Sequence, residues 1–184
     1  MVWVPGLLAS SPDTYAGNPL MRVPTLLDGD RMLIDSDHIA RYLVGRYDAS
    51  DWFGVKSDEP AAMNFLAVAN GIMSNVVVNI LAKRGGLEVT GVVYFEKLQR
   101  AIAEGLAWLD RELKLDAPMT WGDITLICMW QHLGHFNHFK LADLDRYARI
   151  RDRVGQFLAR PAVAATTPEA SLAEATAAGW KPPT

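Results

Sequence analysis

The most apolar segment of the chain follows Thr120-Trp121-Gly122-Asp123, and it constrains the fold more than any other feature. The spacing of Thr120 and Asp123 matches a capping box, with Asp in place of the more usual Glu or Gln, and predicts that a helix begins here. A helix that is apolar on nearly every side has to be covered on all of them. The segment therefore predicts the central helix of a helical bundle.

The neighbouring segments supply the other helices of this bundle. Residues 60–84 and 91–114 predict two long helices, and residues 144–159 predict a shorter amphipathic one. Pro161 suits the first turn of a further short helix. Residues 171–184 are Ala-rich and end in two prolines, which predicts a frayed tail. The apolar stripe of the second helix advances by three and four residues, through Phe95, Leu98, Ile102, Leu106, Leu109 and Leu113.

The chain before residue 48 has a different, strand-forming pattern. Val23-Pro24-Thr25-Leu26-Leu27 and Arg31-Met32-Leu33-Ile34 flank an Asp-Gly turn signal, so residues 23–34 predict an antiparallel hairpin. Met1–Val4 predict a short strand before it. Ser36 is a good N-cap for a following helix, which is expected to stop near Gly45.

These patterns predict two domains joined by a linker. Residues 1–47 form a partial domain with strands, and residues 61–184 form an all-helical domain. Residues 48–60 are rich in Asp, Ser, Gly, Lys and Pro and predict the linker.

Charge and composition exclude several classes of function. The formal net charge is -3, from 21 acidic and 18 basic residues, so no basic surface for nucleic acid is expected. The N-terminus lacks the pattern of a signal peptide. No stretch of about 18 uncharged apolar residues occurs, so nothing is expected to span a bilayer. A cytoplasmic protein without a nucleic-acid or membrane partner is the expectation.

Two candidate reactive features have ordinary explanations. Cys128 lies in an apolar run without nearby Lys or Arg, which predicts a small buried hydrophobe and not a reactive thiol. His132, His135 and His138 are spaced by three, but no acidic or cysteine ligands accompany them, so no metal site is expected.

The order of three motifs resembles the cytosolic glutathione transferase family. Asn18-Pro19-Leu20-Met21-Arg22-Val23-Pro24-Thr25-Leu26, a hairpin, and Asp35-Ser36 before a helix are similar to the second half of its thioredoxin-like domain. Thr120–Asp123 resembles the capping motif of its helical domain, and Phe157–Val163 its last helices. The resemblance extends over residues 1–168. It implies an α+β two-domain fold, with a truncated thioredoxin-like βαββα domain followed by an all-α helical bundle.

The same residues suggest how a peptide would be bound. A proline after Val23 can hold a cis peptide bond, which leaves the N–H and C=O of Val23 free to bind an extended peptide as an added strand. By resemblance this peptide is glutathione, the cosubstrate, with its cysteinyl part beside Val23 and Pro24. Asp35 and Ser36 would lie at its γ-glutamyl end, since a helix N-terminus favours a carboxylate. Arg22 would reach the glycyl carboxylate.

Two alternatives and one departure accompany this hypothesis. Val23-Pro24 also fits an ordinary trans turn, and Asp35-Ser36 a simple helix cap. Met21 stands where the family commonly has glycine, and methionine does not easily take a positive φ. The loop that carries Arg22 is therefore expected to differ from the family pattern.

The catalytic residue of the family is expected to be missing. In the family it is a Tyr, Ser or Cys in a first strand and helix, and a strand–helix–strand unit needs about 30 residues. Only 23 residues precede Pro24, so the first strand and helix are expected to be absent. Ser10, Ser11 and Tyr15 lie too close to Pro24 to take this role.

The resemblance also implies an activity and partners. It suggests a homodimer that transfers glutathione to a small electrophile, as in detoxification. The second-substrate pocket would be lined by one face of the helix over residues 60–84, through Met63, Ala67, Asn70 and Ser74. Core or dimer packing is an equal explanation for that face. The other hypotheses are a noncatalytic interaction module and an inactive truncated relative.

Overall fold

A computed structural model describes residues 9–180 of the chain. The chain divides into two compact units. The first consists of Met1–Lys56 with Ser171–Thr184, and the second of Ser57–Ala170.

The first unit is built on the predicted hairpin. A short 3-10 helix, η1 (Pro12–Tyr15), precedes strands β1 (Thr25–Asp28) and β2 (Arg31–Ile34). The strands are antiparallel, with Thr25 opposite Ile34 and Asp28 opposite Arg31, which confirms the hairpin. Gly29 has a φ of 60°, so the turn needs a residue that tolerates the left-handed region. The strand expected at Met1–Val4 lies outside the described residues.

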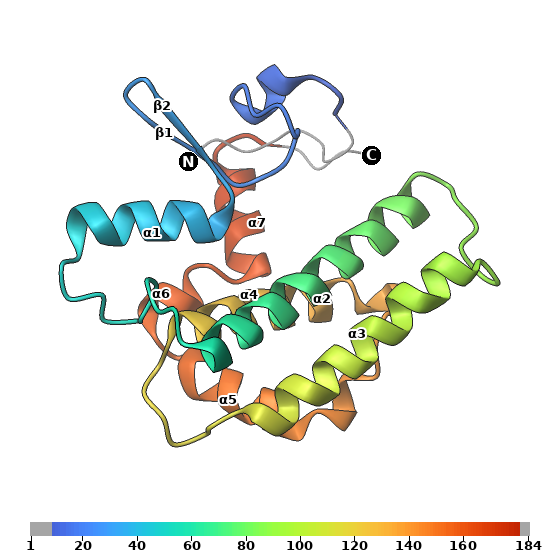
Figure 1. Ribbon diagram of the computed structural model, residues 1–184. Helices are drawn as coiled ribbons and strands as arrows, with labels where there is room; N and C mark the ends of the chain where they lie inside the picture. Colours follow the sequence, from blue (N-terminus) through green and yellow to red (C-terminus); the bar gives the residue numbers. More distant parts are fainter. Residues whose placement is uncertain (1–8, 181–184) are drawn as a thin grey trace. The chain divides into compact units, whose positions relative to one another are not determined.

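Helix α1 (Ser36–Tyr47) follows β2 and packs beside it (Figure 1). It passes through Gly45, where the sequence suggested an end, because Asp48 closes the last turn with its N–H on the Val44 carbonyl. The hydroxyl of Tyr42 donates to the Asp28 carboxylate, and Arg46 Nη1 donates to the Tyr42 hydroxyl at 3.2 Å. These bonds fix α1 to the turn of the hairpin.

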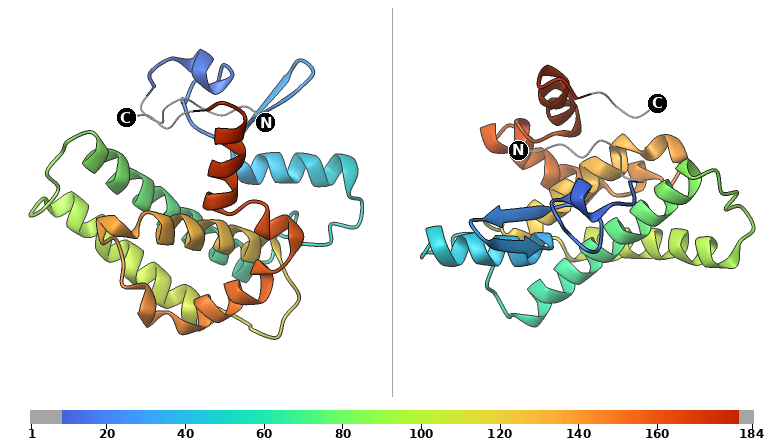
Figure 2. Two further views of the ribbon diagram at one scale, coloured as in Figure 1. Left: turned by 180° about the vertical axis from the view of Figure 1, so that it is seen from behind. Right: turned by 90° about the horizontal axis from the view of Figure 1, so that it is seen from above.

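The second unit is the predicted helical bundle, and its helices have these bounds: α2 (Pro60–Arg84), α3 (Val93–Glu112), α4 (Trp121–His135), α5 (Ala148–Leu158) and α6 (Pro161–Ala164), with 3-10 helices η2 (Asn137–Phe139) and η3 (Leu144–Arg146). Helices α2 and α3 lie side by side and antiparallel in Figures 1 and 2. At their contact a Cβ on Gly105 would lie 2.9 Å from Ile72 Cγ1, so glycine permits the close approach. Helix α4 packs against α2 and α5.

The predicted capping box and central helix are confirmed. The Thr120 side chain accepts from the Asp123 N–H, and the Asp123 side chain accepts from the Thr120 N–H. The centre of the bundle is formed by side chains of α3, α4 and α5 that are at most 1% exposed: Ile102, Leu106, Leu109, Leu126, Met129, Leu133 and Ile150. The apolar stripe predicted for residues 91–114 supplies three of these.

One expectation about the helices is wrong. The segment expected to be a frayed tail contains α7 (Pro168–Ala177). Thr167 Oγ1 accepts from the Ala170 N–H at 3.2 Å, and alanine has the highest helix propensity, so the segment has both a cap and a helical interior.

The expectation that no segment spans a bilayer stays a prediction. Helix α2 is long and apolar enough to be a candidate membrane span by length and composition, with a mean hydropathy of 1.8 in its best window. The sequence expectation overlooked it because Asn and Ser interrupt the run, although residues 61–82 carry no charge. Its packing against α3 and α4 accounts for part of this composition, since 28% of that window is buried in the structure.

Candidate functional site

The hairpin register brings the two halves of the predicted site to the same end of the hairpin. The last pair of the ladder is Thr25 opposite Ile34. Val23-Pro24 directly precedes β1 and Asp35-Ser36 directly follows β2, so both dipeptides lie at this end of the hairpin. Residues that are more than ten positions apart in sequence therefore form one local surface of the first unit.

The backbone of Val23 is available on this surface. The Val23-Pro24 peptide bond is cis, so the alternative of an ordinary trans turn is wrong. Val23 is 55% exposed. Within residues 9–180, neither its N–H nor its C=O has a hydrogen-bond partner. A donor and an acceptor on one exposed residue are what an added peptide strand requires.

Asp35, and not Ser36, is the N-cap of α1. Its Oδ1 accepts from the N–H groups of Asp37 at 3.0 Å and of His38 at 3.2 Å. Asp35 has a φ of 82° and a ψ of 134°. This conformation is strained for a residue other than glycine, by roughly 1–3 kcal/mol, and such strain is concentrated at functional sites.

Ser36 is consequently free for another role. The prediction that its hydroxyl caps the helix is wrong, because the longer-reaching Asp35 carboxylate occupies the amides of the first turn. Ser36 is exposed, and in the described part of the chain neither its hydroxyl nor its N–H has a partner. Both groups remain donors at the positive end of the helix dipole.

The loop before Val23 is held by Asn18, which sequence reasoning quoted in a motif without giving it a role. Its side chain is 0% exposed. Its Nδ2 donates to the Arg22 carbonyl at 2.8 Å and to Thr25 Oγ1 at 3.2 Å. Its Oδ1 accepts from the Leu20 N–H at 2.9 Å. The Asn-Pro pair was the available signal, since Asn side chains commonly close such turns.

Met21 adopts the conformation that its side chain disfavours. Its φ is 49°, in the left-handed region. The premise that methionine avoids a positive φ does not hold at this position, and the expected difference from the family loop stays a prediction. The Asn18 carbonyl, which accepts from the Met21 N–H at 3.0 Å, helps to impose the positive φ.

The positive φ of Met21 leads to a stability prediction. Met21→Gly is expected to raise the free energy of unfolding by about 0.5–1 kcal/mol, because it removes the left-handed strain at the expense of some chain entropy. Met21→Ala is the control, since it removes the side chain but keeps the strain. Urea denaturation checks the order; a Met21→Gly variant no more stable than Met21→Ala contradicts the assignment of strain.

The other predicted residues have different surroundings. Arg22 is exposed and has no ion pair with any residue from 9 to 180. Met63, Ala67 and Ser74 are exposed and Asn70 is half-buried on one face of α2, in the second unit. The Ser74 hydroxyl donates to the Asn70 carbonyl at 2.9 Å, within the helix.

Candidate reactive groups elsewhere offer little chemistry. Tyr15 is 3% exposed and its hydroxyl donates to the Ala9 carbonyl at 3.2 Å. Cys128 is exposed, contrary to expectation, because it lies on the outer side of α4. Partial desolvation nevertheless raises the pKa of its thiol. Desolvation lowers the pKa of His132, and residues 9–180 contain no group of three or more His, Cys, Asp or Glu that could hold a metal.

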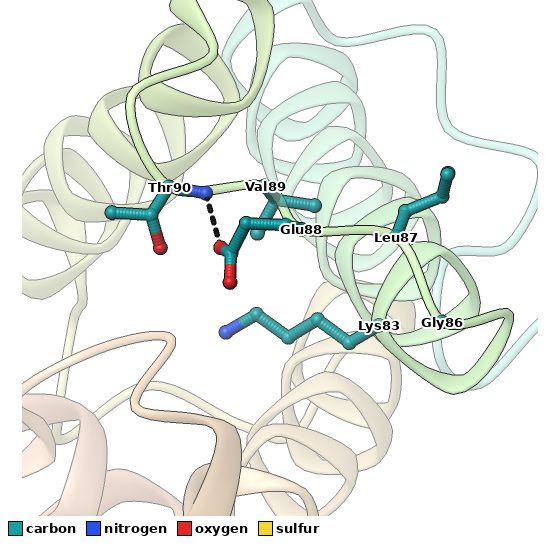
Figure 3. A pocket seen from close by; sticks show the side chains of 6 residues that line it. All are labelled: Lys83, Gly86, Leu87, Glu88, Val89 and Thr90. Carbon is teal, nitrogen blue, oxygen red and sulfur yellow. Dashed lines mark hydrogen bonds between the residues drawn. The ribbon is translucent and has the colours of Figure 1, made fainter.

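The hollow drawn in Figure 3 lies at the end of α2 and in the turn between α2 and α3. It is lined by Lys83, Gly86, Leu87, Glu88, Val89 and Thr90. Glu88 accepts from the Thr90 N–H at 2.8 Å, as Figure 3 shows. Lys83 Nζ donates to the Phe139 carbonyl at 2.9 Å.

Comparison with known proteins finds similarity to glutathione S-transferases, both in the sequence of the first unit and in the fold. Residues 2–51 match the family model of the glutathione S-transferase N-terminal domain. No curated protein sequence matches the chain significantly. A glutathione S-transferase of Methylobacterium radiotolerans, solved with glutathione sulfonate, is 22% identical with a TM-score of 0.72, covering 90% of this chain and 80% of that one.

Two further solved structures are similar. A glutathione S-transferase of Methylobacillus flagellatus with bound glutathione is 22% identical with a TM-score of 0.68, over 82% of this chain and 78% of that one. A maleylacetoacetate isomerase of Methylobacterium extorquens, with malonate and glutathione, is 26% identical with a TM-score of 0.59, over 87% and 79%. The fold is that of a thioredoxin-like domain with a helical domain, as predicted. Residues 2–51 therefore resemble the N-terminal domain of the glutathione S-transferase family, and the fold of the chain is similar to that of the solved glutathione S-transferases.

Proposed function

We propose that the first unit binds glutathione on the surface formed by Val23 and the start of α1. The observation that carries this proposal is the hairpin register, which brings the unpaired backbone of Val23 and the unpaired donors of Ser36 to the same end of the hairpin. An extended tripeptide with a carboxylate at one end matches that arrangement. The structures of similar proteins that hold glutathione support the ligand.

Each residue has a distinct role in this proposal. The N–H and C=O of Val23, next to Pro24, pair with the cysteinyl residue of glutathione. The hydroxyl and N–H of Ser36 donate to the γ-glutamyl carboxylate. The Asp35 oxygen that does not cap α1 accepts from the γ-glutamyl ammonium. Arg22 provides a positive charge for the glycyl carboxylate, and its lack of an ion pair among the described residues leaves it available.

The finer activity follows the family. The protein transfers the bound thiol to a small electrophile, as a cytoplasmic homodimer, with residues 1–47 binding glutathione, residues 48–60 as linker and residues 61–184 as the helical domain. Met63, Ala67, Asn70 and Ser74 contact the electrophile. A thiol with a pKa near 8.5 needs that pKa lowered to react at neutral pH. A pKa of bound glutathione equal to that of free glutathione would contradict transfer chemistry.

A noncatalytic association module is the second candidate, and the surface of α2 favours it. Its exposed side carries Met63, Ala67, Ser74 and Val78, and residues 61–82 include no charged side chain. A long uncharged face of this kind suits contact with a second chain.

Immobilised glutathione separates the two candidates. The proposal predicts that the column retains the chain and that free glutathione elutes it, while a column of immobilised cysteine does not retain it. Sedimentation equilibrium on the same sample measures the dimer. Stable dimers that the glutathione column does not retain would support the association module instead.

A further inference from the structure

We infer that Asn18 is a positioning residue that sets the affinity for glutathione by holding the peptide group between Arg22 and Val23. This inference rests on the proposed function, because it concerns the same site. Asn18 itself is buried and does not contact the ligand surface. Its effect passes through the backbone of the next residues.

The geometry of a trans peptide carries the first step. Val23-Pro24 is the cis bond of the described chain, so the peptide between Arg22 and Val23 is trans. In a trans peptide, the C=O of one residue and the N–H of the next point in opposite directions within one plane. The Arg22 carbonyl points to the buried Nδ2 of Asn18, at 2.8 Å. The Val23 N–H therefore points away from Asn18, to the exposed side.

The other bonds of Asn18 fix the direction of its amide. The Leu20 N–H is a donor, so it requires the Oδ1 of Asn18 on its side, at 2.9 Å. The Nδ2 must then face the Arg22 carbonyl and Thr25 Oγ1, which both accept from it. A reversed amide would set two carbonyl oxygens against each other. With all three groups paired and no exposed surface, the side chain has one orientation, and so does the Val23 N–H.

Without this bond the Arg22 carbonyl keeps only the longer bond from the Thr25 hydroxyl, at 3.4 Å, so the peptide plane rotates more easily. A single-residue bend with no ladder partners has few other restraints, since Val23 lies outside β1 and pairs with no residue from 9 to 180. Rotation would present the Arg22 carbonyl instead of the Val23 N–H to the ligand, an acceptor in place of a donor. Binding would then first have to restore the plane, which weakens it.

Asn18→Asp tests this role most sharply. The substitution keeps the shape and the acceptor for Leu20, but it sets a carboxylate oxygen against the Arg22 carbonyl. The expected result in calorimetry is a dissociation constant for glutathione about ten- to a hundredfold higher, which is the order of the cost of leaving a buried acceptor without its donor. Tyr15→Phe is the control, because it removes a buried hydrogen bond of the same unit without touching Arg22 or Val23.

A local readout separates positioning from general destabilisation. In spectra of ¹⁵N-labelled protein, saturating glutathione is expected to shift the amide signals of Val23 and Ser36 in the wild type. In Asn18→Asp the Val23 shift is lost while the Ser36 shift remains. Equal affinity and an unchanged Val23 shift in Asn18→Asp would overturn the inference and leave the proposed function intact.

A measurement on the wild type covers the case in which Asn18→Asp does not fold. If glutathione binds only the conformation that Asn18 holds, its binding slows hydrogen exchange of the Asn18 side-chain amide, in proportion to ligand saturation. Exchange that glutathione leaves unchanged overturns the role of Asn18. A wild type that does not bind glutathione at all overturns the proposed function, and this inference with it.

Discussion

Arg153→Met is expected to lower the free energy of unfolding by about 3–5 kcal/mol, because it leaves the Asp123 carboxylate buried without its partner. Arg153 and Asp123 are 3% and 5% exposed. Arg153 Nε donates to Asp123 Oδ1 at 2.7 Å, and Nη2 donates to Oδ2 at 2.9 Å. The pair is bidentate, the strongest arrangement of these two groups.

The same guanidinium also closes the loop before α4. It donates to the backbone carbonyls of Leu115, Ala117 and Pro118, at 2.8, 2.9 and 3.0 Å. The substitution therefore leaves these acceptors without Arg153 as well. Asp123 in turn belongs to the capping box that begins the central helix, so the loss reaches the middle of the bundle.

Urea denaturation followed by circular dichroism measures this effect. Arg151→Met is the matched control, since Arg151 is exposed on the same helix, and we expect a change within about 0.5 kcal/mol there. Adding Asp123→Asn to Arg153→Met is expected to recover part of the loss by removing the unpaired charge. A loss below about 1 kcal/mol for Arg153→Met would contradict the buried pair's role.

Ser36→Ala is expected to weaken glutathione binding about tenfold or more, because a hydrogen bond to a charged group contributes about 1.5–3 kcal/mol. The hydroxyl has no partner within the described chain, so its removal is expected to change the free energy of unfolding by no more than about 0.5 kcal/mol. The helix keeps its start because Asp35 provides the cap.

The prediction is specific because Ser36→Ala should lower the affinity for glutathione and leave the free energy of unfolding almost unchanged. Calorimetry gives the dissociation constant and urea denaturation the stability of the same preparations. Ser50→Ala, an exposed serine of the same unit, is the control and should bind as the wild type does. A Ser36→Ala variant that binds normally would mean that the start of α1 does not hold the γ-glutamyl carboxylate.

The elements that sequence reasoning predicted best are those with local signals. The Asp-Gly turn and alternating strands fix the hairpin within residues 23–34. Pro60 and the two glycines after Arg84 bound α2, which has the predicted limits. The capping box identifies the start of α4, because both partners lie within four residues.

The predictions that were wrong or missing depend on backbone angles and helix packing, which the sequence does not determine locally. Asp35 and Ser36 are both good capping residues, and only the backbone angles of Asp35 decide between them. Helix α4 is apolar on almost every side, so its sequence does not tell which side packs against other helices. Cys128 lies on the side that stays exposed. Asn18 was recognisable as a turn residue, but its bond to the Arg22 carbonyl depends on how the loop closes.

The central claim is that the first unit recognises the γ-glutamyl peptide glutathione, and a calorimetric comparison of two peptides tests it most directly. The wild-type chain is titrated with glutathione and with its α-linked isomer, which has the same atoms but places the glutamyl carboxylate elsewhere. The account predicts saturable binding of glutathione, with one site per chain, and at least tenfold weaker binding of the isomer. Equal affinities for the two peptides, or no heat with glutathione, would contradict it.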